Sequence, residues 1–361
     1  MRASSRIKKK TALLIAVYCV ATIQFVWCYL RIVQPWVNTA RYELGHERVP
    51  FQGRMLMVLP MRWANHSSFL SWLAAGFRNH STFWFPRPVL PDVLVQAAVD
   101  VGCLLLAGWL TTRMYEASSS RRLLTPMIYP LFLAVCGATY IMHVTQNFRF
   151  VYDLPSLAFF AIAMYMIYFR WHWGWFVALF CIATVNRETT LLLLPLYMLD
   201  GAVEEGRFAW SRLLRAKTVA VVLPLAALWI AWEIFLHYIF AHHRSELYPR
   251  FDWNLKSLAL PLAWPQLLSA GGYLLLFVVV MRSRIADPRL RAWLWIIPVW
   301  LVFMFACGIL IETRIYGELI PLIVCATALI CEELLVARMK VSRRSSALTV
   351  VDAPGEIREA A

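Results

Sequence analysis

The chain has 361 residues, of which 61% are hydrophobic and 16% are charged, and it contains 17 tryptophans. A composition this apolar is typical of integral membrane proteins rather than of soluble domains. The formal net charge of +14 does not indicate nucleic-acid binding, because no basic helix or aromatic–basic platform accompanies it. We therefore expect an all-α, polytopic membrane protein with no nucleic-acid partner.

Apolar runs follow one another along most of the chain. The first, residues 11–33, is too long for a signal-peptide core and lacks a small-residue cleavage site, so it is expected to remain as a membrane span. The later runs are near a bilayer-crossing length or somewhat shorter, and they cover residues 93–113, 123–143, 153–169, 219–240, 267–281, 292–311 and 316–337. Together they predict a single transmembrane domain over residues 1–339 and a polar, disordered tail over residues 340–361.

The longest polar segment between these runs, residues 34–92, is predicted to be an outer loop. Within it, residues 69–77 have the pattern of an amphipathic helix that lies on the membrane surface. The loop also carries two candidate catalytic carboxylates, Glu43 and Glu47, and the arginine Arg54.

The tetrapeptide Asn186-Arg187-Glu188-Thr189 interrupts an otherwise apolar stretch. Opposite charges at such a position cost several kcal/mol in lipid unless they face a wet or protein-lined cavity. One interpretation is a structural ion pair that locks two helices together. The other is a functional site inside the membrane.

The basic segments between apolar runs indicate how this stretch crosses the membrane. If the N-terminus is cytoplasmic and residues 174–200 cross twice, the basic segments 113–122, 207–217, 282–291 and 338–344 all lie on the cytoplasmic side. A single crossing would place residues 207–217 outside and break this pattern. We therefore predict two short helices that meet at the tetrapeptide on the outer side, about ten membrane segments in all, and two cytoplasmic termini.

Three further segments on the predicted outer face, residues 146–155, 242–246 and 312–318, contain arginines and carboxylates, and two of them also contain tyrosines. The residues of interest in them are Arg149, Tyr152, Asp153, Glu312, Arg314 and Tyr316. The cytoplasmic segments are short and basic, with little other polar chemistry. This asymmetry predicts that the active or binding face is the outer one.

Three features have more than one interpretation. Asp153 stands at the start of a predicted span with a proline two residues later, so it is at least as well suited to cap a helix as to catalyse. His242 and His243 could bind a metal, but no third ligand is suitably spaced, and an interfacial polar pair is favoured. Glu233 could relay protons with His237, although a helix–helix hydrogen bond is the favoured interpretation.

Arginines and carboxylates at the outer face of a membrane suit the transfer of a sugar from a lipid-phosphate donor. The planar guanidinium fork binds phosphate at the level of the headgroups. A carboxylate nearby can accept the proton of a hydroxyl group as that hydroxyl attacks the sugar. Catalysis of this kind depends mainly on positioning and electrostatics.

The order of these elements resembles the GT-C superfamily, whose members are polytopic glycosyltransferases that use polyprenyl-phosphate sugars and include mannosyltransferase-like membrane proteins. Residues 186–195 are similar to the family's basic-Glu-Thr…Leu-Pro segment. Residues 42–54 look like the first-loop segment that carries the catalytic acid, and residues 312–321 look like a late Arg/Tyr-rich stretch before a proline-containing helix. The resemblance concerns the order of these elements over residues 1–330, and the motifs that carry it are short.

The resemblance implies an inverting transfer from a lipid-phosphate donor. Many members carry an aspartate soon after the first span, whereas the first aspartate of this chain is Asp92. Glu43 is therefore the favoured catalytic base, with Glu47 or Asp153 as substitutes. The resemblance leaves a divalent cation open as a cofactor, and the sequence contains no evident metal site.

The residues expected to bind substrate or phosphate share polar or aromatic side chains on the predicted outer face. They are Arg54, Arg149, Tyr152, Asn186, Arg187, Glu188, Glu312, Arg314 and Tyr316. Among them, Arg149, Arg187 and Arg314 are expected to hold the phosphate, and Glu188 is expected to orient Arg187. The expected partners are membrane lipid, the polyprenyl-phosphate sugar and a glycan, lipid or protein acceptor.

The alternative function is a transporter or flippase for an anionic or lipid-linked substrate, because broken helices are typical of transporters. Alternating access requires polar groups that can be reached from both sides, whereas the cytoplasmic half is nearly bare apart from Glu233 and the pair Glu332 and Glu333. A non-catalytic membrane scaffold is a third possibility. The compact loops favour a bacterial inner membrane as the location.

Overall fold

The computed structural model describes residues 2–79, 89–143 and 147–351. These residues are almost entirely helical, and the strands among them are two short pieces. Five segments are long and apolar enough to cross a membrane, namely Thr11–Ile32, Pro91–Ser118, Ala216–Ile239, Pro288–Cys307 and Thr313–Lys340. The predicted all-α class with membrane-spanning helices agrees with this fold.

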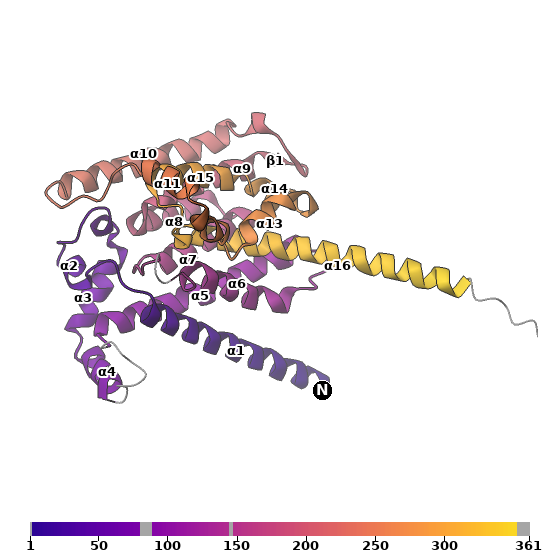
Figure 1. Ribbon diagram of the computed structural model, residues 1–361, viewed down its shortest axis with the longest axis horizontal. Helices are drawn as coiled ribbons and strands as arrows, with labels where there is room; N and C mark the ends of the chain where they lie inside the picture. The colour runs from indigo at the N-terminus through magenta and orange to yellow at the C-terminus, as the bar shows by residue number, and fades with distance from the viewer. Residues whose placement is uncertain (1, 80–88, 144–146, 352–361) are drawn as a thin grey trace, which may run out of the picture.

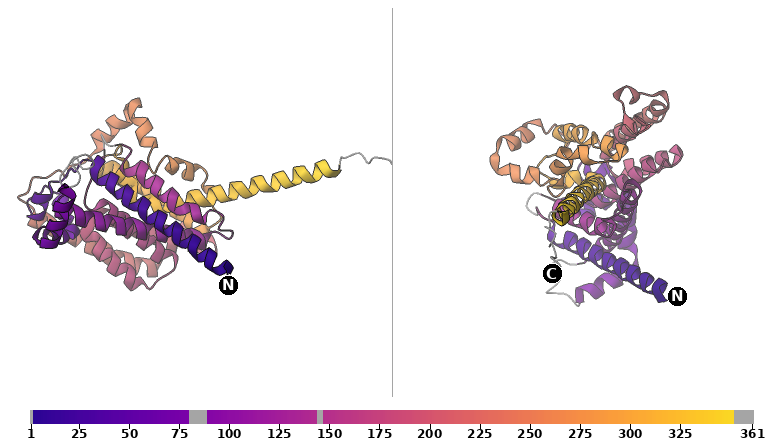
Figure 2. Two further views of the ribbon diagram at one scale, coloured as in Figure 1. Left: turned by 90° about the horizontal axis from the view of Figure 1, so that it is seen from below. Right: turned by 90° about the vertical axis from the view of Figure 1, so that its right-hand side faces the viewer.

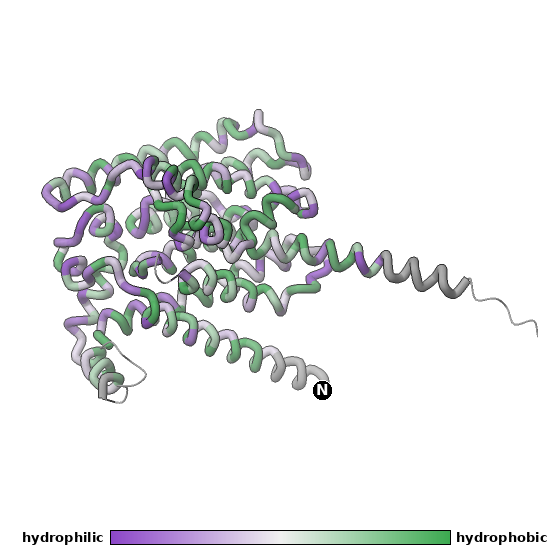
Figure 3. Tube along the Cα trace, viewed as in Figure 1, coloured by the Kyte–Doolittle hydropathy of each residue, from purple (hydrophilic) through white to green (hydrophobic). Residues whose placement is uncertain are grey.

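The long helices lie alongside one another, and the two described ends of the chain are at the same end of the molecule (Figure 1). Helix α1 (Arg2–Ile32) leads from that end to the short helices that follow it at the opposite end. Figure 2 shows that α16 (Ile320–Val351) projects beyond the helical body. Hydrophobic residues run along the helices of the body, and hydrophilic residues gather towards its two ends (Figure 3).

The central helix of the body is α5 (Pro91–Ser118), which packs against α1, α6 (Thr125–Tyr140), α7 (Asp153–Tyr168) and α16. Helix α7 is enclosed by other parts of the protein, because buried side chains occur on all its faces. Apolar helices without a polar face are expected where other helices or lipid surround them.

Residues 34–79 form a separate layer of short helices at the end where α1 finishes (Figure 1). They are α2 (Thr39–Glu43), η1 (Phe51–Gly53), η2 (Met55–Met57), α3 (Val58–His66) and α4 (Ser68–Asn79). A small apolar core that includes Tyr42, Phe51 and Tyr152 holds this layer against the segment before α7. The predicted surface helix lies within α4, where Phe69 and Trp72 are 63% and 70% exposed.

Residues 174–200 form two short helical pieces on either side of Arg187, as predicted. Helix α8 (Trp173–Asn186) is followed by η3 (Glu188–Leu192) and α9 (Leu193–Gly201). Asp200 at the end of α9 accepts a 2.8 Å hydrogen bond from Arg289, which also donates to the carbonyl oxygen of Tyr168 at the end of α7. Because α8 begins shortly after Tyr168, α8 starts and α9 ends at the same end of the body.

A two-stranded antiparallel hairpin, β1 (Val203–Glu204) and β2 (Arg207–Phe208), connects α9 to η4 (Trp210–Arg212) and α10 (Ala216–Ile239). The rest of the chain consists mostly of short helices. They are α11 (Phe251–Ala259), η5 (Pro261–Ala263), α12 (Trp264–Leu268), α13 (Leu274–Val280), η6 (Arg282–Arg284), α14 (Pro288–Trp293), α15 (Ile296–Cys307) and η7 (Thr313–Leu319).

Two predictions differ from the structure in this second half. The apolar run 267–281 is not one helix, because Gly271, Gly272 and Tyr273 have positive φ angles of 58°, 66° and 66° that end α12 and start α13 anew. The tail is predicted to be disordered from Lys340, whereas α16 continues to Val351 because no proline or glycine interrupts it there. The remaining residues of the predicted tail, 352–361, lie outside the described residues.

Candidate functional site

Arg187 lies at the centre of a buried cluster of charges. Its Nη1 atom is 3.2 Å from Asp153 Oδ1 and 2.8 Å from Glu318 Oε1, and both carboxylates have no exposed side-chain surface. The hydroxyls of Ser156 and Thr189 donate hydrogen bonds of 3.0 and 3.1 Å to the same oxygen of Glu318. One cation thus balances two buried carboxylates, and the hydrogen bonds offset part of their desolvation cost.

This cluster forms where three segments distant in sequence meet. Helix α7 begins at Asp153, α8 ends at Asn186, and η7 contains Glu318. The side-chain amide of Asn186 donates a 3.1 Å hydrogen bond to the carbonyl oxygen of Tyr152, which ties the end of α8 to the start of α7. Arg187 has an extended backbone, with φ −165° and ψ 141°, so the helix is broken at the residue that carries the charge.

Arg314 joins the cluster from the same segment as Glu318. Its Nη1 atom is 3.5 Å from Asp153 Oδ1, and its Nη2 atom is 2.5 Å from Glu312 Oε2. The guanidinium also lies 4.0 Å from the centre of the Phe150 ring, a distance that permits a cation–π interaction. Asp153 therefore receives positive charge from two arginines.

A second ion pair connects the first loop to η3. Arg54 Nε donates a 2.8 Å hydrogen bond to Glu188 Oε2, and Arg54 Nη2 pairs with the other oxygen of the same carboxylate. Its guanidinium lies 4.3 Å from the centre of the Tyr152 ring. The structure differs here from the prediction that Glu188 orients Arg187, because the extended backbone at Arg187 sends consecutive side chains to opposite sides.

A cavity of about 860 Å³ lies beside these ion pairs and is lined by the first loop, η3, α10, the segment 244–253 and the segment 303–315. Five arginines and four glutamates contribute to its wall, together with several aromatic rings: Arg54, Arg187, Arg244, Arg250, Arg314, Glu188, Glu233, Glu246 and Glu312. A space of this size is within the range of small-molecule binding sites. Concentrated charge of both signs, within an apolar helical body, makes it the candidate site.

Two of the cavity arginines form no ion pair with a described residue. The side chain of Arg244 is exposed and makes no hydrogen bond with the described residues. Arg250 donates to the carbonyl oxygen of Glu246 at 3.3 Å and lies 3.7 Å from the centre of the Tyr248 ring. Both guanidinium groups are available to an anionic ligand, and the set of residues predicted from the sequence included neither.

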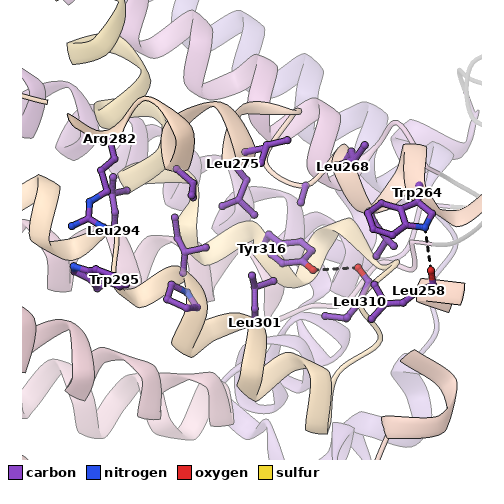
Figure 4. Close-up of a pocket in the computed structure, with 16 residues that line it drawn as sticks. Leu258, Trp264, Leu268, Leu275, Arg282, Leu294, Trp295, Leu301, Leu310 and Tyr316 are labelled. Atoms are coloured by element: carbon purple, nitrogen blue, oxygen red, sulfur yellow. Dashed lines mark hydrogen bonds between the residues drawn. The ribbon is translucent and has the colours of Figure 1, made fainter. Parts of the chain in front are cut away.

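An apolar groove of about 430 Å³ lies next to this cavity, and Figure 4 shows the residues that line the groove. Its lining is almost entirely aliphatic and aromatic, with Arg282 stacked 4.4 Å from the Trp295 ring at one end. The segment 309–316 is a shared wall of the two spaces, because some of its residues line the groove and others line the cavity. Tyr316, predicted to bind substrate, lies in the groove and donates its hydroxyl to the carbonyl oxygen of Leu310 at 3.3 Å.

The two predicted catalytic glutamates of the first loop do not line the cavity. The carboxylate of Glu43 accepts hydrogen bonds of 2.9 and 2.7 Å from Asn65, and burial raises its pKa although that hydrogen bond opposes the rise. Glu47 is 2% exposed and accepts from the backbone N–H groups of Asn38 and Arg48 at 3.1 and 3.0 Å. These contacts suit Glu47 to shaping the loop, and the catalytic role of Glu43 stays a prediction.

Asp153, the third predicted carboxylate, is buried behind the cavity wall. The interpretation of Asp153 as a helix cap is wrong, since Tyr152 occupies the cap position and the Asp153 carboxylate binds arginines instead. Arg149 is also absent from the cavity lining, and it is 8% exposed. It faces Asp100, a fully buried residue of α5 that interacts electrostatically with both Arg149 and Asp153.

Glu318 and Arg244 stand in segments predicted to face outward, but they were not among the predicted site residues, and neither was Asp100. Glu318 follows Tyr316 closely and stands in the same polar segment, which was the available signal for it. The favoured interpretation of Glu233, a helix–helix hydrogen bond, is not observed, because its side chain forms no hydrogen bond with the described residues. Among the described residues no group of three His, Cys, Asp or Glu side chains is arranged to hold a metal ion.

Comparisons of this chain with protein-family models, with curated proteins and with solved structures find no match. The assignment of a function therefore depends on the geometry and chemistry of the cavity.

Proposed function

We propose that this chain is a membrane glycosyltransferase of the GT-C type, which transfers a sugar from a polyprenyl-phosphate-linked donor to a glycan, lipid or protein acceptor. The observation that carries the proposal is the pairing of a charged cavity with an apolar groove across the shared segment 309–316. A lipid-phosphate donor has both a charged head and a long hydrocarbon chain. Arginines suit the phosphate, and the groove suits the hydrocarbon.

The arginines of the cavity divide into two groups with different proposed roles. Arg244 and Arg250 bind the donor phosphate directly, since no carboxylate among the described residues neutralises them. Arg54, Arg187 and Arg314 keep their carboxylate partners and hold the cavity wall in place around the donor.

We further propose about ten membrane segments, in which short helices and consecutive helix pairs cross in addition to the five long segments. Both described ends of the chain lie at one end of the body, and the cavity-lining segment 244–253 lies at the other, as Figure 1 shows. A cytoplasmic N-terminus then puts the cavity on the outer face of a bacterial inner membrane, where the acceptor is met.

The experiment that tests the proposal uses the purified protein in lipid nanodiscs with a panel of radiolabelled polyprenyl-phosphate sugars. Transfer of label to an acceptor is expected for the wild type. Arg244→Gln removes one charge-assisted contact to phosphate, so the KM for the donor should rise by about 10- to 100-fold. Arg284→Gln is the matched control, because Arg284 is exposed and lines neither space.

Two outcomes would contradict the proposal. Movement of the labelled lipid between leaflets without transfer would indicate the alternative function, a flippase. Equal donor KM values for Arg244→Gln and Arg284→Gln would show that Arg244 does not bind the donor, which contradicts the proposed role of the cavity. A Glu43→Gln variant belongs in the same series, since transfer that survives this change excludes Glu43 as the catalytic base.

A further inference from the structure

Glu233 stands on the inward face of α10, a helix whose other faces are apolar and exposed. Leu225 and Leu236 are buried, and Trp229 is partly buried against the core, so these residues mark the inward face. Glu233 follows Trp229 by four residues, which places it on the same face. Ile234, by contrast, is 65% exposed and points away from the protein.

Two contacts set the position of this part of α10 relative to the cavity. The indole Nε1 of Trp229 donates a 3.1 Å hydrogen bond to the carbonyl oxygen of Glu188 in η3. Leu236 packs against Gly53 so closely that a Cβ atom on that glycine would be 3.0 Å from Leu236 Cδ1. Glu233 lies between these two contacts along the helix, beside the first loop and η3.

Glu233 differs from the other cavity glutamates in having no ionic partner among the residues that the structure describes. Glu188 pairs with Arg54, Glu246 pairs with Arg48, and Glu312 pairs with Arg314. Glu233 forms no ion pair with a described residue, although it lines the same cavity. A carboxylate in an apolar helix is costly, and a partnerless one contributes nothing to helix packing that would offset the cost.

We propose that Glu233 is the general base of the transfer reaction, an inference that rests on the proposed function. The acceptor hydroxyl gives its proton to the Glu233 carboxylate while its oxygen forms a bond to the anomeric carbon of the sugar. The bond between that carbon and the phosphate oxygen breaks, and its electron pair leaves with the polyprenyl phosphate. Arg244 and Arg250, which line the same cavity, hold the departing phosphate.

The surroundings of Glu233 suit this role. The charged groups that face it are Glu188 on η3 and Arg54 in the first loop, and His237 stands one turn later on the same helix. Glu188 and Arg54 are paired with each other, so neither competes for the proton of the acceptor. The free carboxylate of Glu233 is therefore the cavity group that a neutral hydroxyl can use as a base.

The test compares wild type, Glu233→Gln and Glu233→Asp in nanodiscs with a radiolabelled polyprenyl-phosphate sugar, with Glu204→Gln as the control in an exposed hairpin. Glu233→Gln should lower kcat by about 100- to 10,000-fold while the Kd for the donor changes less than threefold. The wild-type rate should rise with pH as Glu233 loses its proton. That dependence should be absent in Glu233→Gln and retained, at a lower rate, in Glu233→Asp.

Wild-type kcat and an unchanged pH profile in Glu233→Gln would overturn the assignment of Glu233 and leave the proposed function standing. Failure of the wild type to transfer any polyprenyl-phosphate sugar would overturn both. If Glu233→Gln does not fold, the test depends on Glu233→Asp. The shorter side chain moves the carboxylate away from the acceptor hydroxyl, so an unchanged kcat in this variant would exclude Glu233 as the base.

Discussion

Several charged residues of this protein are buried, and each is compensated by specific partners of opposite charge. Arg187 contacts Asp153 and Glu318, and all three side chains are at most 5% exposed. Buried pairs of this kind contribute little net stability, but removal of one partner leaves a charge without compensation. The cluster therefore acts as a rigid support for the cavity wall rather than as a group that moves during a reaction.

The first prediction concerns Glu43, whose pKa burial raises above its usual range. A carboxyl group with a raised folded-state pKa contributes stability below its unfolded pKa, and this contribution is lost as the pH rises through the folded pKa. As the pH rises above about 4, the melting temperature of the wild type should therefore fall by more than the melting temperature of Glu43→Gln. The measurement is thermal unfolding in detergent across this range.

The Glu43 carboxylate accepts from Asn65, so Asn65→Ala provides the matched comparison. Loss of that hydrogen bond should raise the Glu43 pKa further and extend the loss of stability to higher pH. Identical pH dependence in wild type and Glu43→Gln would show that Glu43 does not titrate differently on folding.

At the scale of secondary structure, close helix contacts depend on glycines at particular positions. A Cβ atom on Gly108 of α5 would be 2.4 Å from a ring atom of Tyr129 on α6. That ring cannot move away freely, because it stacks on Tyr18 with 4.7 Å between centroids and its hydroxyl is 2.6 Å from the hydroxyl of Thr22. Three helices thus meet at this contact.

The second prediction follows from this contact. Gly108→Ala should destabilise the protein by about 1–3 kcal/mol through overpacking. Gly102→Ala on the same helix meets nothing within 4 Å, so it should be neutral or add up to about 1 kcal/mol through helix propensity. Thermal unfolding of both variants measures the difference. If Gly108→Ala and Gly102→Ala were equally stable, the Tyr129 ring would have to lie further from Gly108 than in this structure.

The break between α8 and η3 is the second feature at this scale. Arg187 interrupts the helical hydrogen bonds, and the hydroxyl of Thr190 donates a 2.8 Å hydrogen bond to the carbonyl oxygen of Arg187. A backbone carbonyl group that lies inside an apolar helical body without its helical partner needs another hydrogen-bond donor. Thr190 satisfies that carbonyl oxygen through both its hydroxyl and its backbone N–H, which donates at 3.2 Å.

At the scale of the whole molecule, the two ends of the body differ in chemistry. The cavity and the first-loop helices lie at one end, and the short basic connections, including the β1–β2 hairpin, lie at the other (Figure 1). Lysines and arginines in short loops are retained on the cytoplasmic side of membranes. The proposed orientation follows from this difference.

The third prediction tests that orientation with single cysteines in a variant that lacks the native ones. A membrane-impermeable maleimide added to intact cells should label His242→Cys, which lies near the cavity, and should not label Ser211→Cys in η4. Both positions are exposed, so permeabilised cells should be labelled at both. Labelling of Ser211→Cys alone in intact cells would reverse the proposed orientation.

Much of the candidate site was predictable in location but not in its pairings. Nine residues were predicted to bind substrate, and Arg54, Arg187, Glu188, Glu312 and Arg314 do line the cavity. The sequence could not indicate that Arg54 pairs with Glu188, because 134 positions separate them. Contacts of that range depend on how helices pack, and no local pattern in the chain records them.

The sequence by itself determined that this protein is a helical membrane protein with a broken helix at Arg187. The hydrophobicity of a segment and the places where a helix breaks depend on residues that are close together in the sequence. Both can therefore be predicted from the sequence alone. Only the tertiary structure decided which charges are buried together and which remain free. The Glu43 carboxylate is hydrogen-bonded away from the cavity, whereas Glu233 lines the cavity without an ionic partner in the described part of the chain. The strength of an electrostatic interaction depends on the distance between the two charges. For charges on different helices that distance is set only when the helices pack, so the sequence alone does not determine which charges become paired.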